Sequence, residues 1–314
     1  MKRGYKIFIS FIITNVVVIS FILLSHYISE SNVVKMEGEK ERETYLSIVT
    51  TNKFLYSMVR DITKDMHEVT YMMKDQKSQW NFKYTQDSIK NISKKDLFIY
   101  FGASYEPWAS TFVDELKRDN VTVLNASRGI RIMNLNSPIK YNDRVIKENP
   151  YYWLNPEEYK TALLNIKNAI GEKDPKNLSF YDKNFNEEME QVDLIISKLR
   201  EVSEKLQNST FVLTNDNLDY FFKFTGLNYI KIPSGEGVKN EDIQKAYDKL
   251  GTTENLIYIY SDKEDLKNYE KLIKDCKMRT VEFLLDSEDI GYKAMMNKNI
   301  ENLEKVSGNT EMNK

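Results

Sequence analysis

The chain has 314 residues, 41% of them hydrophobic and 29% charged, with a formal net charge of −2. A single core stops growing near about 250–300 residues, so this length predicts two folded parts rather than one. The balanced charge excludes the basic surface that a nucleic-acid-binding protein needs. The single cysteine, Cys276, excludes an intrachain disulfide and is expected to be a small buried residue.

The chain opens with a basic flank and an apolar run. Lys2, Arg3 and Lys6 precede residues 7–24, which carry no charge and are mostly apolar. This pattern is typical of an export signal, and a run of about 18 residues is also just long enough to cross a bilayer. Basic residues on the short N-terminal side place that end in the cytoplasm. The rest of the chain is therefore expected outside the cytoplasm.

Two features favour a retained anchor over a cleaved signal. Ser29-Glu30-Ser31 is a poor match to the small-residue cleavage pattern, and no cysteine directly follows the run for lipid attachment. We therefore expect residues 1–28 to stay as a membrane anchor, with cleavage as the alternative. Residues 29–45 are polar and charged without apolar periodicity, which predicts a tether.

Strand-like and helix-like patterns alternate through the rest of the chain. The strand-like runs are residues 46–50, 68–73, 96–101, 121–125, 210–214, 228–232, 255–260 and 280–284. Helical spacing is found at residues 55–64, 85–94, 108–119, 218–224, 240–249, 262–277 and 291–306. Such alternation predicts parallel sheets with crossover helices.

One long segment separates the two groups of alternating elements. Apolar residues recur at three- and four-residue steps through residues 174–208, and Asp174-Pro175 fits a helix start. At 1.5 Å per residue such a helix would be about 50 Å long, which exceeds one lobe. The predicted fold is α/β, with two lobes, each a parallel sheet with flanking helices, joined by this linker helix. The boundaries are 46–173 for the first lobe, 174–208 for the linker, 209–306 for the second lobe and 307–314 for a tail.

Four strings in these elements resemble the motifs of a known family. They are Ser104-Tyr105-Glu106-Pro107-Trp108, Asn149-Pro150-Tyr151-Tyr152-Trp153-Leu154-Asn155-Pro156, Thr214-Asn215-Asp216-Asn217-Leu218-Asp219-Tyr220-Phe221 and Leu285-Asp286-Ser287. Their order and spacing resemble the zinc/manganese-binding proteins of metal ABC importers, in the cluster with two α/β lobes joined by a rigid helix. The resemblance extends from about residue 46 to residue 306. It implies an extracytoplasmic solute-binding protein.

The resemblance also implies where a metal would bind, because that family takes one ligand from each of four loops. The family has histidine at the first two positions, histidine or glutamate at the third and aspartate at the fourth. In this chain the four positions fall at Gln79, Tyr151, Asn215 and Asp286. Only Asp286 keeps an ionisable ligand type.

These residue types argue against tight binding of a transition metal. Zinc sites need thiolate, imidazole or carboxylate ligands, usually four of them. Gln79 and Asn215 offer neutral amide oxygens, and Tyr151 would have to lose a proton whose reference pKa is near ~10. His67, one of only two histidines, precedes a strand far in sequence from the cleft loops. We expect a degenerate member with no tightly bound cofactor. The candidate cations are zinc or manganese by family, and weakly bound calcium or magnesium by residue type.

Two other interpretations remain open. Trp80, Trp153 and Tyr220 could line a cleft for a small polar organic ligand, or Trp153 and Tyr220 could instead pack the lobe interface. Alternatively, the chain is a membrane-anchored surface interaction or sensory protein that kept the scaffold. The sequence has no nucleophile elbow, paired-cysteine, zinc-protease or phosphate-loop motif, so catalysis is not expected. The expected partners are an importer permease and the membrane, the expected state is a monomer, and the expected location is the cell membrane with the folded part outside.

Overall fold

The computed structural model describes residues 45–73, 80, 82–116, 120–141, 144–233, 240–286 and 290–308. The expected anchor, the tether up to residue 44 and the ligand position Gln79 lie outside these residues. None of the helices in the described ranges is both long and apolar enough to cross a membrane.

The first lobe contains a four-stranded sheet whose strands all run parallel. The strands are β1 (Ser47–Asn52), β2 (Glu68–Met73), β3 (Leu97–Tyr100) and β4 (Thr122–Asn125), in the order β2-β1-β3-β4. The helices between these strands are α2 (Lys53–Thr63), α4 (Gln86–Ile92) and α5 (Ala109–Leu116). The strand–helix alternation predicted for this part of the sequence is confirmed.

Helix α2 illustrates how the sequence sets these elements. Asn52 ends β1 and caps the helix, because its Oδ1 accepts a hydrogen bond from the backbone N–H of Leu55 at 2.9 Å. That bond satisfies one of the N–H groups that a helix start leaves unpaired. The buried apolar side chains recur at three- and four-residue steps: Phe54, Leu55, Met58, Val59 and Ile62. One face of α2 therefore packs against the core.

The second lobe repeats the arrangement of the first. Its parallel strands are β7 (Thr210–Leu213), β8 (Asn228–Lys231), β9 (Leu256–Tyr260) and β10 (Arg279–Glu282), in the order β10-β9-β7-β8. Counted along the chain, each lobe has the order second, first, third and fourth strand. The helices between these strands are α8 (Asp219–Thr225), α9 (Asn240–Gly251), α10 (Lys263–Asn268) and α11 (Glu270–Asp275).

One helix predicted in the second lobe is wrong in detail. The sequence predicted a single helix over residues 262–277, and the structure has α10 and α11 separated by Tyr269. Tyr269 has φ −106° and ψ 11°, which breaks the α-helical path. Its hydroxyl donates to the carbonyl of Pro233 at 3.1 Å, so tertiary contact accompanies the break.

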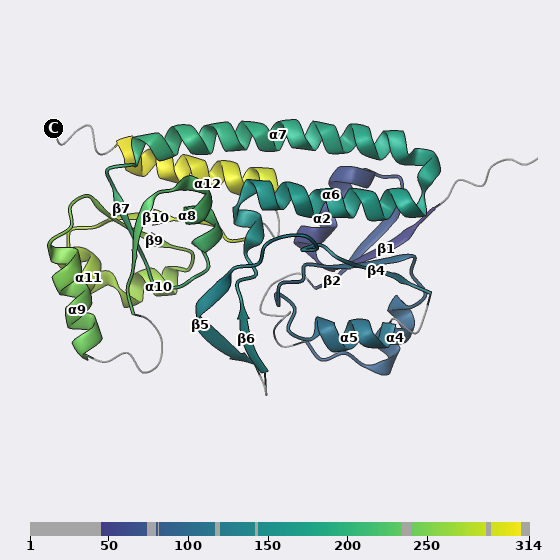
Figure 1. Ribbon diagram of the computed structural model, residues 1–314, viewed down its shortest axis with the longest axis horizontal. Coiled ribbons are helices and arrows are strands. Elements are labelled where there is room, and N and C mark those ends of the chain that lie inside the picture. Colours follow the sequence, from purple (N-terminus) through teal and green to yellow (C-terminus); the bar gives the residue numbers. More distant parts are fainter. Residues whose placement is uncertain are drawn as a thin grey trace, which may run out of the picture. The chain divides into compact units, whose positions relative to one another are not determined.

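The long helix exists but is shorter than the sequence predicted. Pro175–Asn177 form a 3-10 turn, and the α-helix α7 spans Leu178–Lys205. The start shifts because α6 (Pro156–Lys173) ends directly before it, with the N–H of Asp174 bonded to Ile170 O at 2.9 Å. A helix of 28 residues is about 42 Å long. It packs on α2 and α6 and also on α8 and α12 (Gly291–Gly308), so it runs along both lobes (Figure 1).

Helices from both lobes share one hydrophobic core. The rings of Tyr159 in α6 and Tyr292 in α12 stack with centroids 3.5 Å apart and planes at 6°. Phe54 of α2 lies parallel to Tyr292 at 6.4 Å. One continuous buried cluster contains all three residues together with the inner faces of both sheets. Because protein interiors are close-packed, this shared core resists hinge motion between the lobes.

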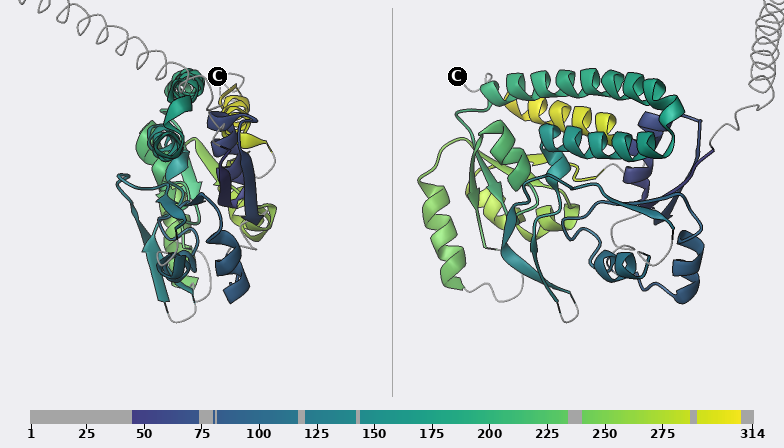
Figure 2. Two further views of the ribbon diagram at one scale, coloured as in Figure 1. Left: turned by 90° about the vertical axis from the view of Figure 1, so that its right-hand side faces the viewer. Right: turned by 45° about the vertical axis from the view of Figure 1, so that its right-hand side comes forward.

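An antiparallel hairpin, absent from the sequence prediction, follows the first sheet. Its strands are β5 (Asn134–Tyr141) and β6 (Arg144–Glu148), with a register irregularity between Asn134 and Ile139. Residues 134–138 include two asparagines and a proline, which are depleted in strands, so no strand signal marks β5. Figure 2 shows the hairpin extending away from the side where α6, α7 and α12 gather.

A buried glutamate supports the loop between β3 and α5. Residues 102–104 all have positive φ, between 49° and 75°. Glu106 is 3% exposed, and its Oε1 accepts from Thr51 Oγ1 at 2.5 Å and from the N–H of Phe101 at 3.0 Å. Its Oε2 accepts from the N–H of Gly102 at 3.2 Å. Burial raises the pKa of Glu106 to about 7, although these hydrogen bonds act to lower it.

We predict that Glu106 makes folding stability depend on pH. An acid whose pKa is higher in the folded state contributes stability that is full below its unfolded pKa and is lost as pH rises through the folded value. The loss between pH 4.5 and about 7 is of the order of 3 kcal/mol. Urea unfolding from pH 5 to 7.5 should show this slope, and Glu106→Gln should reduce it, leaving the smaller contribution of Asp61, whose pKa burial raises to about 6. The matched control, Glu201→Gln on the exposed side of α7, should keep the slope, and an unchanged slope in Glu106→Gln would contradict the assignment.

Candidate functional site

Tyr151 lies on the first lobe, immediately before the 3-10 turn Tyr152–Leu154. Its side chain is 7% exposed, and its ring lies edge-on to Trp153 with centroids 5.4 Å apart. Its backbone N–H donates to Oδ1 of Asn149 at 3.1 Å. The ring of Tyr151 is therefore part of a packed aromatic cluster rather than an open ligand position.

Asn215 lies on the second lobe, in the loop that follows β7. It is exposed, and its Oδ1 accepts from the backbone N–H of Asn217 at 3.0 Å. This bond is the local turn that asparagine side chains commonly make with the backbone two residues later. The amide oxygen that would have to serve as a metal ligand is thus turned onto its own loop.

Asp286 follows β10 and is half-buried. The residue before it, Leu285, accepts a hydrogen bond through its carbonyl from Nε1 of Trp153 at 2.7 Å. Trp153 belongs to the first lobe and is fully buried. The loop that carries Asp286 is therefore bonded directly to the first lobe.

The residue next to Asn215 makes several contacts between the lobes. The carboxylate of Asp216 accepts from the N–H of Asn136 at 2.6 Å, from Nδ2 of Asn136 at 2.8 Å and from the N–H of Ser137 at 3.1 Å. Its backbone carbonyl accepts from Nδ2 of Asn149 at 2.6 Å. Lys231 also bonds the carboxylate. We call Asp216, Asn136, Ser137, Asn149 and Lys231 the Asp216 cluster.

The charge around this cluster is only partly compensated. Lys231 also lies 2.6 Å from a carboxylate oxygen of Asp219, so one ammonium is shared by two carboxylates. Burial acts to raise the pKa of Asp216, but hydrogen bonds from Lys231, Asn136 and Ser137 outweigh it and lower the pKa. Burial raises the pKa of Asp219, since Lys231 compensates it only in part. Asp216 is therefore held as a carboxylate at the lobe interface.

The aromatic residues considered for a cleft lie largely inside the protein. Trp153 is fully buried and Tyr220 is 1% exposed. The hydroxyl of Tyr220 accepts from the N–H of Met133 at 2.7 Å, which is another bond between the lobes. Both residues thus occupy the packed lobe interface. Trp80 is half-buried, and the residues beside it in the chain, 74–79 and 81, lie outside the described ranges.

Sequence reasoning named the positions around Asn215 but missed the role of its neighbour. Asp216 stands in the string that resembles the family motif, so its position was visible. Its partners were not, because Asn136 and Ser137 lie about 80 residues away on a hairpin with no strand signal. Nothing in the local pattern pairs those segments.

Metal-ligand side chains do not converge in the part of the chain that the structure describes. No group of three or more histidine, cysteine, aspartate or glutamate residues there could hold a metal ion. His67 is buried in the first lobe, with Nε2 2.6 Å from the hydroxyl of Tyr181, which donates to Asp174 at 2.5 Å. Burial lowers the pKa of His67, so it serves as a neutral structural residue.

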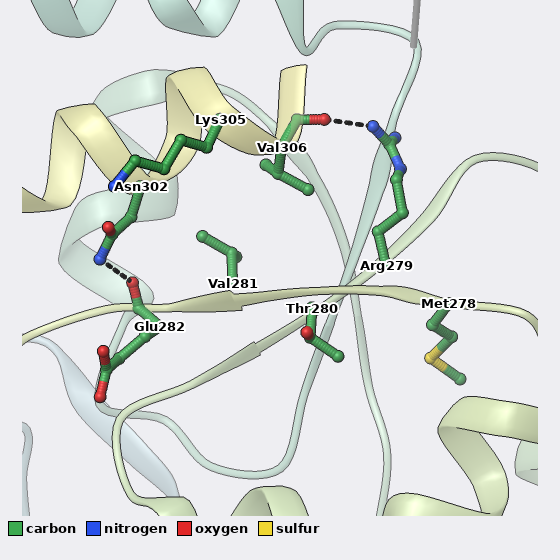
Figure 3. A pocket seen from close by; sticks show the side chains of 8 residues that line it. All are labelled: Met278, Arg279, Thr280, Val281, Glu282, Asn302, Lys305 and Val306. Carbon is green, nitrogen blue, oxygen red and sulfur yellow. Dashed lines mark hydrogen bonds between the residues drawn. The ribbon is translucent and has the colours of Figure 1, made fainter. Parts of the chain in front are cut away.

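Among the cavities of the described residues, one beside β10 and one in the first lobe lie away from the family ligand positions. One, of about 440 Å³, lies between the edge strand β10 and α12 (Figure 3). Arg279 there donates to the carbonyl of Val306, and Asn302 donates to the carbonyl of Glu282 at 3.0 Å. The other, of about 270 Å³, lies in the first lobe and is lined in part by Ser104. None of Tyr151, Asn215 and Asp286 lines either cavity.

The fold and the lobe interface define a class of protein: a two-lobed α/β protein with a helical spacer. Solved structures share this fold. The metal-dependent lipoprotein YcdH of Bacillus subtilis matches with a TM-score of 0.70 and 20% identity, over 83% of this chain and 98% of that one. The zinc-bound ZnuA-like domain of AdcA from Streptococcus pneumoniae matches with a TM-score of 0.68 and 16% identity, over 84% and 99% of the two chains.

The family model "Zinc-uptake complex component A periplasmic" matches residues 48–306, so the chain belongs to this ZnuA family. The high-affinity zinc uptake protein ZnuA of Bacillus subtilis is 25% identical over 194 residues, 60% of each chain. The manganese transporter lipoprotein PsaA of Streptococcus pneumoniae is 24% identical over 200 residues, 62% of this chain and 63% of that one. The family resemblance inferred from the four strings is confirmed. The relatives of this chain include a zinc uptake protein and manganese ABC transporter substrate-binding lipoproteins, and the folded part of this chain is extracytoplasmic, at the cell membrane.

Proposed function

We propose that this chain is an extracytoplasmic solute-binding protein of the metal-importer type in which tight binding of zinc and manganese has been lost. The residues at the family ligand positions support the proposal most directly. Tyr151 is buried in an aromatic cluster, Asn215 bonds its own loop, and only Asp286 is a carboxylate. The protein is proposed to be a monomer without enzymatic activity.

The ligand chemistry gives the physical reason. Gln79, Tyr151, Asn215 and Asp286 together supply at most one formal negative charge and no imidazole. A zinc or manganese ion would lose its hydration shell without gaining charge neutralisation or nitrogen donors. A weak site for calcium or magnesium, with Asp286, amide oxygens and water, is compatible with the same residues. Extracellular calcium sites of that kind work at about 10⁻⁴–10⁻³ M.

We predict that the protein binds zinc and manganese no more tightly than about 10 µM, which corresponds to about −7 kcal/mol. Isothermal titration calorimetry tests this on the full chain in detergent, after chelator treatment and removal of the chelator. Calcium should be titrated in parallel, to separate a weak oxygen site from no site. Zinc or manganese binding well below 10 µM would refute the proposal.

The second candidate is a membrane-anchored surface interaction or sensory protein that retains the scaffold. The bonds between the lobes favour it, since Asp216, Trp153 and Tyr220 join the lobes through direct hydrogen bonds. Native mass spectrometry of the protein as purified distinguishes the candidates. A co-purifying small solute supports binding of another cargo, and co-purification with a permease supports transport. Neither species, with weak metal binding, supports the interaction protein.

A further inference from the structure

We propose that Asp216 is a positioning residue that fixes the two lobes in one closed arrangement, whether or not a solute is bound. This goes beyond the proposed function, because it concerns how the lobes are held and not what they bind. Asp216 is 7% exposed, and its carboxylate accepts three N–H donors from the hairpin of the first lobe. Hydrogen bonds to an ionised acceptor are about twice as strong as those between neutral groups.

The positive charge that supports this carboxylate is built into the chain. Lys231 on β8 bonds both Asp216 and Asp219. A buried carboxylate without a partner would be strongly unfavourable, and removing one partner of such a pair leaves an uncompensated charge. Lys231 therefore supplies next to Asn215 a cation that belongs to the protein itself.

Two further bonds fix the other loops at this interface. Trp153 Nε1 donates to the carbonyl of Leu285, beside Asp286, at 2.7 Å. Asn149 joins Tyr151 to the Asp216 cluster, because its Oδ1 accepts from the N–H of Tyr151 and its Nδ2 donates to the Asp216 carbonyl. Each described family position thus lies in a loop that these bonds tie to the other lobe. The separation of the loops is consequently set by protein contacts.

Double electron–electron resonance on the full chain in detergent tests the inference. Spin labels at Lys94→Cys in the first lobe and Lys274→Cys in the second, in a Cys276→Ala background, report the distance between the lobes. Both lysines are exposed. We expect a single narrow distance distribution that is the same with EDTA and with zinc. A shift of the main distance on adding either reagent would overturn the inference.

Variants on both sides of the contact complete the test. Asp216→Asn should broaden the distribution and add a longer distance, and should speed amide exchange at Asn136 and Ser137 at least tenfold. Asn136→Ala, which alters the first lobe only, should broaden the distance distribution less than Asp216→Asn does. If Asp216→Asn does not fold, Asn136→Ala tests the inference in its place. The matched control Asp193→Asn removes an exposed carboxylate paired with Lys160 and should change neither measurement.

Distributions in both cluster variants identical to the unsubstituted pair would refute the positioning role. The outcome is separable from that of the proposed function. Tight zinc binding by calorimetry with an unchanged distance in EDTA would refute the loss of metal binding and support the fixed lobes. Weak metal binding, together with a distance that changes on adding zinc, would support the loss of metal binding and refute the fixed lobes.

Discussion

Replacing Gln79, Tyr151 and Asn215 together by histidine is expected to create a tight zinc site. The triple variant would present three imidazoles and the carboxylate of Asp286, a ligand set of the kind zinc prefers. We expect the dissociation constant to fall by at least 100-fold, which is about 2.7 kcal/mol or more. Calorimetry on the triple variant and the unsubstituted protein, under identical conditions, measures the change.

Controls separate the ligand set from a general effect of added histidines. Adding Asp286→Ala to the triple variant should remove most of the gain, because one of four ligands is lost. A variant with three histidines at exposed lysines, Lys94, Lys249 and Lys274, should gain nothing. If the triple variant binds zinc no better than the unsubstituted chain, the lobe interface differs from the family's in shape as well as in residues.

Trp153→Ala is expected to lower the free energy of unfolding by about 3–5 kcal/mol, the range for removing a large buried aromatic side chain. Trp153 is fully buried, and its ring lies 4.6 Å from that of Phe101 and 5.3 Å from that of Tyr105, between centroids. The substitution also leaves the carbonyl of Leu285 without its donor. Urea denaturation followed by circular dichroism measures the loss.

Trp153→Phe separates packing from hydrogen bonding. Phenylalanine keeps most of the ring and loses Nε1, so the expected loss is about 1 kcal/mol from the bond to Leu285, with a smaller packing term. Trp153→Phe and Trp153→Ala with equal effects would mean that the bond between the lobes, and not the aromatic cluster, dominates. A loss below about 1 kcal/mol in Trp153→Ala would contradict the packing described for this residue.

The fold was accessible from the sequence because its signals are local. Strand-like runs at residues 46–50 and 210–214 correspond to the central strands β1 and β7, and the long apolar period corresponds to α7. Parallel strands buried on both faces produce such runs, and helices between them produce the three- and four-residue spacing. The helix starting point was less accessible, because Asp174 and Pro175 serve the corner between α6 and α7 rather than the first turn of α7.

The candidate site likewise has features that the sequence determines and features that only the fold determines. The residue types at Tyr151, Asn215 and Asp286 are facts of the sequence, and they decide the ligand chemistry by themselves. The positions of the side chains do not follow from the sequence. The hydrogen bond of Asn215 to its own loop and the burial of Tyr151 depend on their three-dimensional surroundings.

The sequence by itself therefore determined that the chain is α/β, with two lobes and a long helix. It also determined the family, and it showed that only Asp286 of the four family ligand positions keeps an ionisable ligand type. Only the tertiary structure decided that the lobes share one core and that Asp216 meets Asn136 and Ser137 across the interface. The physical reason is the distance along the sequence over which each kind of interaction acts. Periodicity and capping reflect neighbours within a few residues, whereas a buried carboxylate finds its donors wherever the folded chain brings unpaired N–H groups within reach.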